Sequence, residues 1–239
     1  LIVALFLFGG VERASRPPCC VALTMVDFVF AADEGGLDVE AEKSWNFELG
    51  VRTATPLVAA EVAGFFLHID DLVAAGRGTA FRNLGSARTY GLEVAGTVNG
   101  GVLGPLPTLP LAYTLLNTEV LDGVIPSALS NNALADLEGN ELPYAPRHTV
   151  AVGLSQTVRG VTARVDARYV SEVFTDFENL DFTTGRGDTG PVPDYVVLNA
   201  SIRVPVGDRL VAQLTGKNLL DEVYIGSRLH SNPRQVTAT

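Results

Sequence analysis

The sequence contains little lysine, cysteine or charge. Lys43 and Lys217 are its only lysines, Cys19 and Cys20 are its only cysteines, and charged residues make up 18% of the 239 residues. One adjacent cysteine pair excludes a disulfide framework and the ligand spacing of a cysteine zinc site. The net charge of −10 argues against a nucleic-acid partner, because phosphate binding needs clustered lysine and arginine.

Long apolar runs are also missing. The longest, residues 1–8, is far shorter than the roughly 18 residues with which a helix spans a bilayer, and so is the run at residues 57–60. Hydrophobic residues nevertheless make up 47% of the chain. If the chain enters a membrane, it therefore does so as a β-barrel, the other structure that satisfies its backbone there.

Catalytic and metal-binding patterns are absent as well. His68, His148 and His230 lie far apart and have no carboxylates at ligand spacing, so no metal site and no cofactor are predicted. The sequence has no nucleophile elbow, phosphate-binding loop or zinc-protease helix motif. No enzymatic activity is predicted.

What the sequence does contain, from residue 44 onward, is strict alternation of apolar and polar residues. In residues 161–169, Val161, Val165 and Tyr169 share one face, whereas Arg164 and Arg168 share the other. This period of two predicts a strand with one dry and one wet surface. The same pattern predicts eight strands, at residues 44–52, 58–69, 89–98, 109–118, 149–158, 161–169, 195–204 and 210–217.

The predicted connections alternate in length. Residues 53–56, 100–107, 159–160 and 206–209 form short turns, and residues 70–78, 121–142 and 172–193 form long loops. Short turns at one end and long loops at the other are typical of an outer-membrane barrel. A soluble β-sandwich, which is a competing hypothesis, has no reason to sort its loops in this way.

In a membrane barrel the apolar faces contact lipid and the polar faces line the interior. Aromatic residues near the strand ends fit the girdles at the two membrane surfaces: Trp45, Tyr144, Tyr169, Phe174, Tyr195 and Tyr224. The predicted interior faces carry charges of both signs and amides: Glu48, Arg52, Glu93, Arg164, Asp166, Arg168, Asn199, Arg203, Gln213 and Lys217.

Residues 1–43 lack this rhythm. Their apolar stretches and the basic Arg13 and Arg16 allow a secretory signal cleaved after Ala31, but Asp27 interrupts the second apolar stretch. The favoured interpretation is an unassigned N-terminal extension. The predicted division is therefore residues 1–43 and a partial barrel at residues 44–239.

Several short motifs resemble one family in order along the chain. They lie at residues 44–50 (SWNFELG), 83–85 (NLG) with 90–94 (YGLEV), 142–148 (LPYAPRH), 169–171 (YVS) with 176–179 (DFEN), 192–195 (VPDY) and 216–225 (GKNLLDEVYI). Residues 44–234 resemble the C-terminal part of the barrel of TonB-dependent outer-membrane receptors, especially the ferric-citrate and siderophore branch.

The resemblance implies an all-β, antiparallel transmembrane barrel of 22 strands, of which this chain holds about eight. It also implies an N-terminal plug domain, contact with the inner-membrane TonB protein, and energised uptake of a ferric siderophore or ferric citrate across the outer membrane of a Gram-negative-type cell. No plug and no closing strand match the sequence, so the chain is interpreted as a fragment.

Ligand recognition is predicted to lie in the long loops. Ferric citrate and many siderophore complexes are anionic, and arginine suits carboxylates. The candidate ligand-binding residues are Arg77, Arg82 and Arg186. A passive porin or structural outer-membrane barrel is the alternative function.

Overall fold

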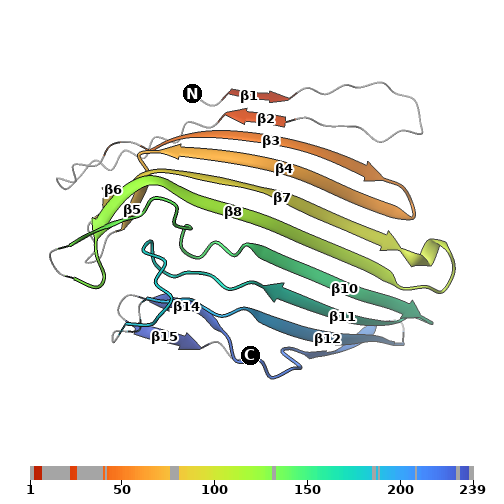
Figure 1. The fold of residues 1–239 in the computed structure, drawn as a ribbon. Coiled ribbons are helices and arrows are strands. Elements are labelled where there is room, and N and C mark those ends of the chain that lie inside the picture. The colour runs from red at the N-terminus through yellow and green to blue at the C-terminus, as the bar shows by residue number, and fades with distance from the viewer. Residues whose placement is uncertain are drawn as a thin grey trace.

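The computed structural model describes residues 3–6, 22–25, 40, 42–75, 81–130, 133–184, 187, 189–207, 209–229 and 232–236. One large antiparallel sheet contains most of them (Figure 1). No helix of the described residues is long and apolar enough to cross a membrane. A 3-10 turn, η1 (Gly100–Val102), lies between two strands of the sheet.

The main sheet confirms the eight predicted strands and extends several of them. In spatial order, its strands are β13 (Leu210–Gly216), β12 (Tyr195–Val206), β11 (Val161–Val170), β10 (His148–Val158), β8 (Thr108–Pro126), β7 (Gly85–Asn99), β4 (Val58–Asp70) and β3 (Lys43–Ala54). Every neighbouring pair is antiparallel, and the order along the sheet follows the order along the chain.

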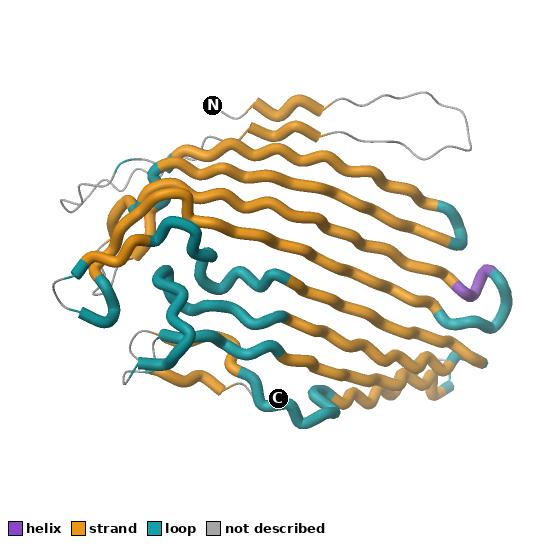
Figure 2. The backbone as a smooth tube through the Cα atoms, in the orientation of Figure 1, coloured by secondary structure: helices purple, strands orange, loops and turns teal. Residues whose placement is uncertain are grey.

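The two ends of the sheet differ as the sequence predicts. Short turns join the strands at one end, called the turn end, and the long loops gather at the other, called the loop end (Figure 2). Between β10 and β11, Arg159 and Gly160 both have positive φ angles, 50° and 84°. Such a pair forms the tight hairpin turn whose twist matches that of the two strands.

The long loops contain more structure than the sequence predicts. The loop expected at residues 70–78 carries a small hairpin of β5 (Val73–Ala75) and β6 (Phe81–Asn83). The prediction of a loop at residues 121–142 is wrong at its start, because β8 continues to Pro126 and pairs there with β9 (Leu134–Asp136). Two further hairpins are β1 (Val3–Phe6) with β2 (Ala22–Met25) and β14 (Ile225–Leu229) with β15 (Asn232–Val236).

A small hydrophobic core lies at the loop end rather than inside the sheet. Leu84, Val120 and Leu137 are buried together, with exposed fractions of 5%, 1% and 0%. Ile125, Leu142 and Phe177 pack against them. Three long loops therefore share one apolar centre, although they are far apart in sequence.

Candidate functional site

The cross-strand register separates the sheet into two chemically different faces. Residues directly opposite each other on antiparallel strands point to the same side. One register row contains Arg52, Glu61, Ala95, Ala112, Ala151 and Arg168. The row one residue away, on the opposite face, contains Val51, Val62, Val94, Tyr113, Val150 and Tyr169.

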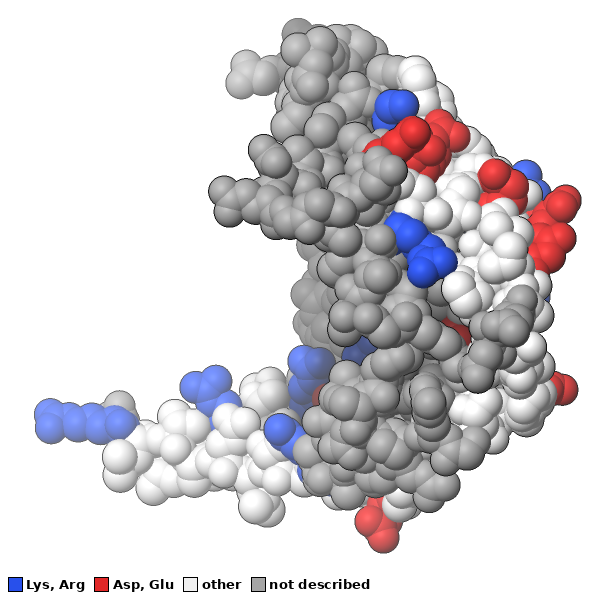
Figure 3. Space-filling model, turned by 90° about the vertical axis from the view of Figure 1, so that its left-hand side faces the viewer, with Lys and Arg blue, Asp and Glu red and all other residues white. Residues whose placement is uncertain are grey.

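The polar face is concave. Viewed from the loop end, the sheet curves around a hollow that is open on one side (Figure 3). A groove of about 560 Å³ lies against this concave face. Alanines form its floor, and polar side chains from four strands stand around it: Arg52, Glu61, Arg164, Asp166, Arg168 and Asn199.

Asp166 is the centre of a polar chain that connects three segments. Its carboxylate accepts hydrogen bonds from Asn199 Nδ2 at 2.9 Å and from Arg164 Nε at 3.3 Å. Asn199 Oδ1 in turn accepts the backbone N–H of Asn218 at 3.0 Å. Asn218 has a positive φ of 50° and exchanges two hydrogen bonds of 3.0 Å with the backbone of Glu222.

These hydrogen bonds give a structural role to residues 216–222, which are part of the last motif of the sequence. Asn218 is buried, with 8% of its surface exposed, and its backbone conformation suits an asparagine. The motif thereby fixes the strand end at Gly216 to β12. The sequence could not reveal the partner, because Asp166 and Asn218 lie far apart along the chain.

Some charged side chains on the concave face have no close partner of opposite charge among the described residues. Arg52 and Glu61 approach only to 4.0 Å, and both side chains are more than half exposed. Arg168 forms no ion pair with any residue that the structure describes. An exposed pair of this kind contributes little to stability, so Arg52 and Arg168 remain available to attract an anion entering the groove.

Two long loops are joined by a set of hydrogen bonds, called here the loop clasp. Asn179 donates from Nδ2 to the carbonyl of Glu141 at 2.9 Å and accepts that residue's N–H at 2.6 Å. Asn140 donates to the carbonyl of Phe177 at 2.9 Å. Glu178 accepts hydrogen bonds from the Ser127 hydroxyl, at 2.9 Å, and from the N–H of Ala128. The described residues of segments 127–147 and 171–194 are therefore held together.

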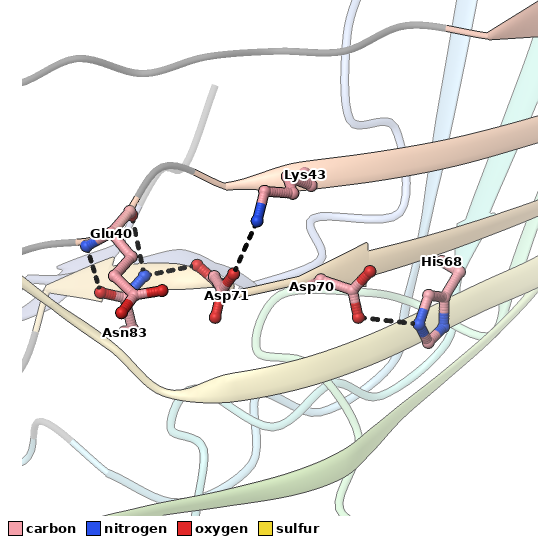
Figure 4. A network of polar contacts seen from close by, with 6 residues as sticks. All are labelled: Glu40, Lys43, His68, Asp70, Asp71 and Asn83. Atoms are coloured by element: carbon pink, nitrogen blue, oxygen red, sulfur yellow. Dashed lines mark hydrogen bonds and ion pairs between the residues drawn. The ribbon is translucent and has the colours of Figure 1, made fainter.

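The loop that follows β4 is anchored at its base (Figure 4). Asn83 donates to the carbonyls of Asp71 and Glu40, at 2.7 and 3.0 Å, and accepts the N–H of Glu40 at 2.8 Å. Lys43 lies 3.8 Å from Asp71. These contacts fix the chain on either side of the β5–β6 hairpin.

The structure describes one of the three predicted ligand-binding arginines. Arg82 lies in β6, next to Asn83, and is half-buried; its Nε is buried without a hydrogen-bond partner among the described residues. Arg77 and Arg186 lie outside the described residues. The three arginines stay a prediction. Within the described part of the chain, no group of three His, Cys, Asp or Glu side chains is placed to hold a metal ion.

One open, curved sheet with a polar concave face and an apolar convex face matches a known family of barrels. A family model described as "TonB dependent receptor-like, beta-barrel" matches residues 4–219. The chain belongs to this family. The TonB-dependent receptor barrels are outer-membrane proteins, and the single curved sheet contradicts the soluble two-sheet sandwich.

Solved structures of TonB-dependent receptors share the fold. The ferric citrate transporter FecA in its unliganded form is 22% identical, with a TM-score of 0.68 over 83% of this chain. The siderophore receptor PiuA from Acinetobacter baumannii is 20% identical, with a TM-score of 0.65 over 83% of this chain. The ferric yersiniabactin uptake receptor FyuA from Yersinia pestis is 21% identical, with a TM-score of 0.62 over 79% of this chain.

This chain covers only part of those receptors: 29% of FecA, 27% of PiuA and 26% of FyuA. The family match begins at residue 4, so it includes most of the segment assigned to an N-terminal extension. The division between residues 1–43 and 44–239 stays a prediction.

Proposed function

We propose that this chain forms part of the barrel of an outer-membrane receptor that takes up an iron complex, either a ferric siderophore or ferric citrate, into a Gram-negative-type cell. The observation that carries the proposal is the polarity of the sheet in a chain of this family: its convex face is apolar and its concave face is polar, the reverse of a soluble barrel. Leu49, Val51 and Val158 expose more than half of their surface on the convex face. The concave face carries the groove and the Arg52–Glu61 and Arg164–Asp166 pairs.

Reversed polarity favours lipid outside and water inside. A convex face in water would leave a continuous apolar surface across eight strands, far beyond the few hundred Å² that soluble monomers expose. Against lipid the same side chains are stable, and the charged concave side chains are hydrated by the interior.

Under this proposal, arginines of the loops and of the concave face contact the anionic iron complex one after the other. Arg77, Arg82 and Arg186 in the long loops would meet the anionic complex first, since arginine forms charge-assisted hydrogen bonds with carboxylates. Arg52 and Arg168 would then meet it on the concave face. Nε of Arg82 is buried and has no hydrogen-bond partner among the described residues; this supports the role, because a ligand oxygen would satisfy it.

We also propose that transport depends on TonB, through a plug domain encoded outside this chain. The chain covers less than a third of the solved receptors it matches, and the outer edge of β13 has no strand partner among the described residues. Both observations support a chain that is one part of a larger barrel.

Uptake by cells tests the proposed function. The complete receptor would be produced in a Gram-negative host without its own iron-complex receptors, and radioactive iron would be supplied as ferric citrate or as a ferric catecholate. We expect accumulation of one complex, and only when TonB is present. Accumulation of both complexes and of unrelated solutes of similar size without TonB would show a passive pore instead.

Loop-arginine variants test the proposed recognition. We expect Arg82→Gln, Arg77→Gln and Arg186→Gln each to weaken binding of the transported complex by about tenfold, because a charge-assisted hydrogen bond contributes roughly 1.5 kcal/mol or more. Arg209→Gln, at the turn end, is the control and should bind normally. Equal affinity in all four variants would exclude the loop arginines as ligand contacts.

A further inference from the structure

The charged side chains of the concave face are segregated by strand. On β11 and β12 this face carries three arginines and one acid, whereas on β3, β4 and β7 it carries three acids and one arginine. The two groups therefore have opposite net charge. The arginines of the first group, called here the arginine ladder, are Arg164, Arg168 and Arg203, and the acids of the second are Glu48, Glu61 and Glu93.

An uncharged floor separates the two groups. β8 and β10 lie between β7 and β11 in the sheet. Every concave position from Thr108 to Thr114 and from Thr149 to Thr157 is Thr, Pro, Ala, Gly or Ser. Strands lie roughly 4.8 Å apart, so the three steps from β7 to β11 give the floor a width of about 14 Å. A solute on this floor has acids on one side and arginines on the other.

The arginine ladder runs along the strands rather than across them. Arg168 is nearest the loop end, and Arg164 lies four residues closer to the turn end on the same strand. Arg203 on β12 lies opposite Thr162, two residues beyond Arg164. At roughly 3.3 Å per residue, these six residues give the ladder a length of about 20 Å. The ladder therefore follows most of β11 from the loop end toward the turn end.

Little negative charge in the described part of the chain offsets the ladder. Arg164 lies 3.3 Å from Asp166, whose carboxylate also accepts a hydrogen bond from Asn199. Arg168 and Arg203 form no ion pair with a described residue, and all three arginines are exposed. Arg164 and Arg203 are diagonal neighbours on β11 and β12, which places like charges close together. An anion beside them would offset their repulsion.

We propose that the arginine ladder is the path along which the anionic iron complex crosses the barrel interior after it leaves the loops. This inference rests on the proposed function and names the side of the wall that the complex follows. Cations at successive levels offer an anion several weak contacts in series, which allow it both to enter and to leave. The acids of β3, β4 and β7 repel the same complex and keep it near β11 and β12.

Uptake kinetics of the complete receptor test the ladder. Arg164→Gln, Arg168→Gln and Arg203→Gln would be combined, and radioactive iron supplied as ferric citrate or as a ferric catecholate, whichever the parent receptor accumulates. We expect the maximal rate of uptake to fall by about tenfold, the lower end of the effect of a charged cleft on a charged solute. The Kd for binding to cells without TonB should be unchanged, because the loops remain intact.

Lysine at the same three positions separates charge from shape. This variant keeps the positive charges and should retain at least half of the parent rate. Arg209→Gln, in the turn before β13, removes one charge outside the concave face and should transport normally. If the triple glutamine variant does not reach the outer membrane, Arg203→Gln alone replaces it, and we expect its rate to fall at least twofold.

The remaining outcomes distinguish the ladder from the proposed function. A normal rate in the glutamine variant, or a lysine variant as slow as the glutamine variant, would overturn the ladder and leave the proposed function intact. Entry of a large antibiotic such as vancomycin into the glutamine variant without TonB would show that the arginines hold the plug instead, which also overturns the path. Absence of iron uptake by the parent receptor would overturn the proposed function and the ladder together.

Discussion

Phe65 and Gly91 lie opposite each other on β4 and β7, on the concave face. A Cβ atom on Gly91 would lie 2.6 Å from Cζ of Phe65 and 2.0 Å from the carbonyl oxygen of Leu115. The aromatic ring therefore covers the backbone of Gly91 and replaces the side chain that the glycine lacks. Glycine at this position allows a close approach that any larger residue prevents.

Substitution of this glycine gives the first prediction. Gly91→Ala should lower the free energy of unfolding by about 1–3 kcal/mol, because the added methyl group overlaps the ring and a backbone oxygen. Urea unfolding of the receptor in lipid vesicles measures the change. Gly64→Ala is the matched control, since its nearest non-neighbour atom would lie 3.9 Å away. Equal losses in both variants would contradict the packing argument.

At the scale of elements, the β10–β11 hairpin depends on two residues with positive φ. Gly160 accepts this conformation without strain, whereas Arg159 adopts it at some cost, because its side chain crowds the backbone. The turn fixes the register between β10 and β11, and β11 carries Asp166 and Arg168. Turn chemistry at the turn end therefore determines which side chains line the groove.

The second prediction concerns this turn. Gly160→Ala should destabilise the receptor by about 1–2 kcal/mol, because a left-handed conformation is unfavourable for a residue with a Cβ. Arg159→Asn should stabilise it, because asparagine tolerates positive φ and Asn-Gly is a preferred hairpin turn. Unfolding midpoints of the two variants and the parent test both signs. A shift in the same direction for both variants would be inconsistent with the proposed cause.

The loop clasp is the second element with a distinct role. Asn179 has a φ of 51° and makes three hydrogen bonds through its amide, two of them to Glu141. It holds the two loops over the core of Leu84, Val120 and Leu137. The clasp should make residues 140–142 and 176–179 move together.

The third prediction tests the clasp with Asn179→Gly, which keeps the positive φ and removes the amide. We expect faster amide hydrogen exchange at Glu141 and Leu142, by about tenfold, since each lost hydrogen bond contributes roughly 1 kcal/mol. Asn218→Gly, which also has a positive φ, is the control and should speed exchange only near Glu222. Unchanged exchange at Glu141 in the Asn179 variant would show that the clasp does not hold the loops.

At the scale of the whole molecule, the two faces of the sheet meet different solvents. Val94 and Ala95 are adjacent in β7, yet the first lies on the convex face between Val62 and Tyr113 and the second lines the concave groove beside Glu61. Neighbours along the chain are therefore in unlike environments. The proposed function depends on this separation, because the charged side chains that surround the groove lie on the concave face.

The fourth prediction compares the same substitution at these neighbours. Val94→Arg should destabilise the receptor in vesicles by about 2–4 kcal/mol, because arginine would lie near the bilayer midplane. Ala95→Arg should change stability by less than about 1 kcal/mol, since the guanidinium reaches the hydrated interior and Glu61. Unfolding of both variants provides the comparison. A larger loss for Ala95→Arg would reverse the assignment of the faces.

The main sheet could be predicted from residues alone because strand patterns are local. The residues from Trp45 to Val51, and from Val161 to Tyr169, alternate between apolar and polar because successive side chains of a strand point to opposite faces. The Arg159-Gly160 turn and the order of the motifs were equally local. The eight strands, the sorting of loop lengths and the family were predicted correctly for this reason.

Local patterns could not predict structure made by distant residues. Three features join segments that are distant in sequence, and nothing in either segment alone identifies its partner. They are the core of Leu84, Val120 and Leu137, the pairing of β9 with the end of β8, and the clasp between Glu141 and Asn179. The asparagines at positions 179 and 218 were the one indication of these connections in the sequence, because asparagine tolerates the positive φ that both residues adopt.

The sequence by itself determined that the sheet has one apolar and one polar face, since the period of two fixes side-chain direction along each strand. Only the tertiary structure decided which face is concave and how the strands are aligned with one another. That alignment places Arg164, Asp166 and Asn199 together around the groove. Curvature and register arise between strands, so no single strand contains them.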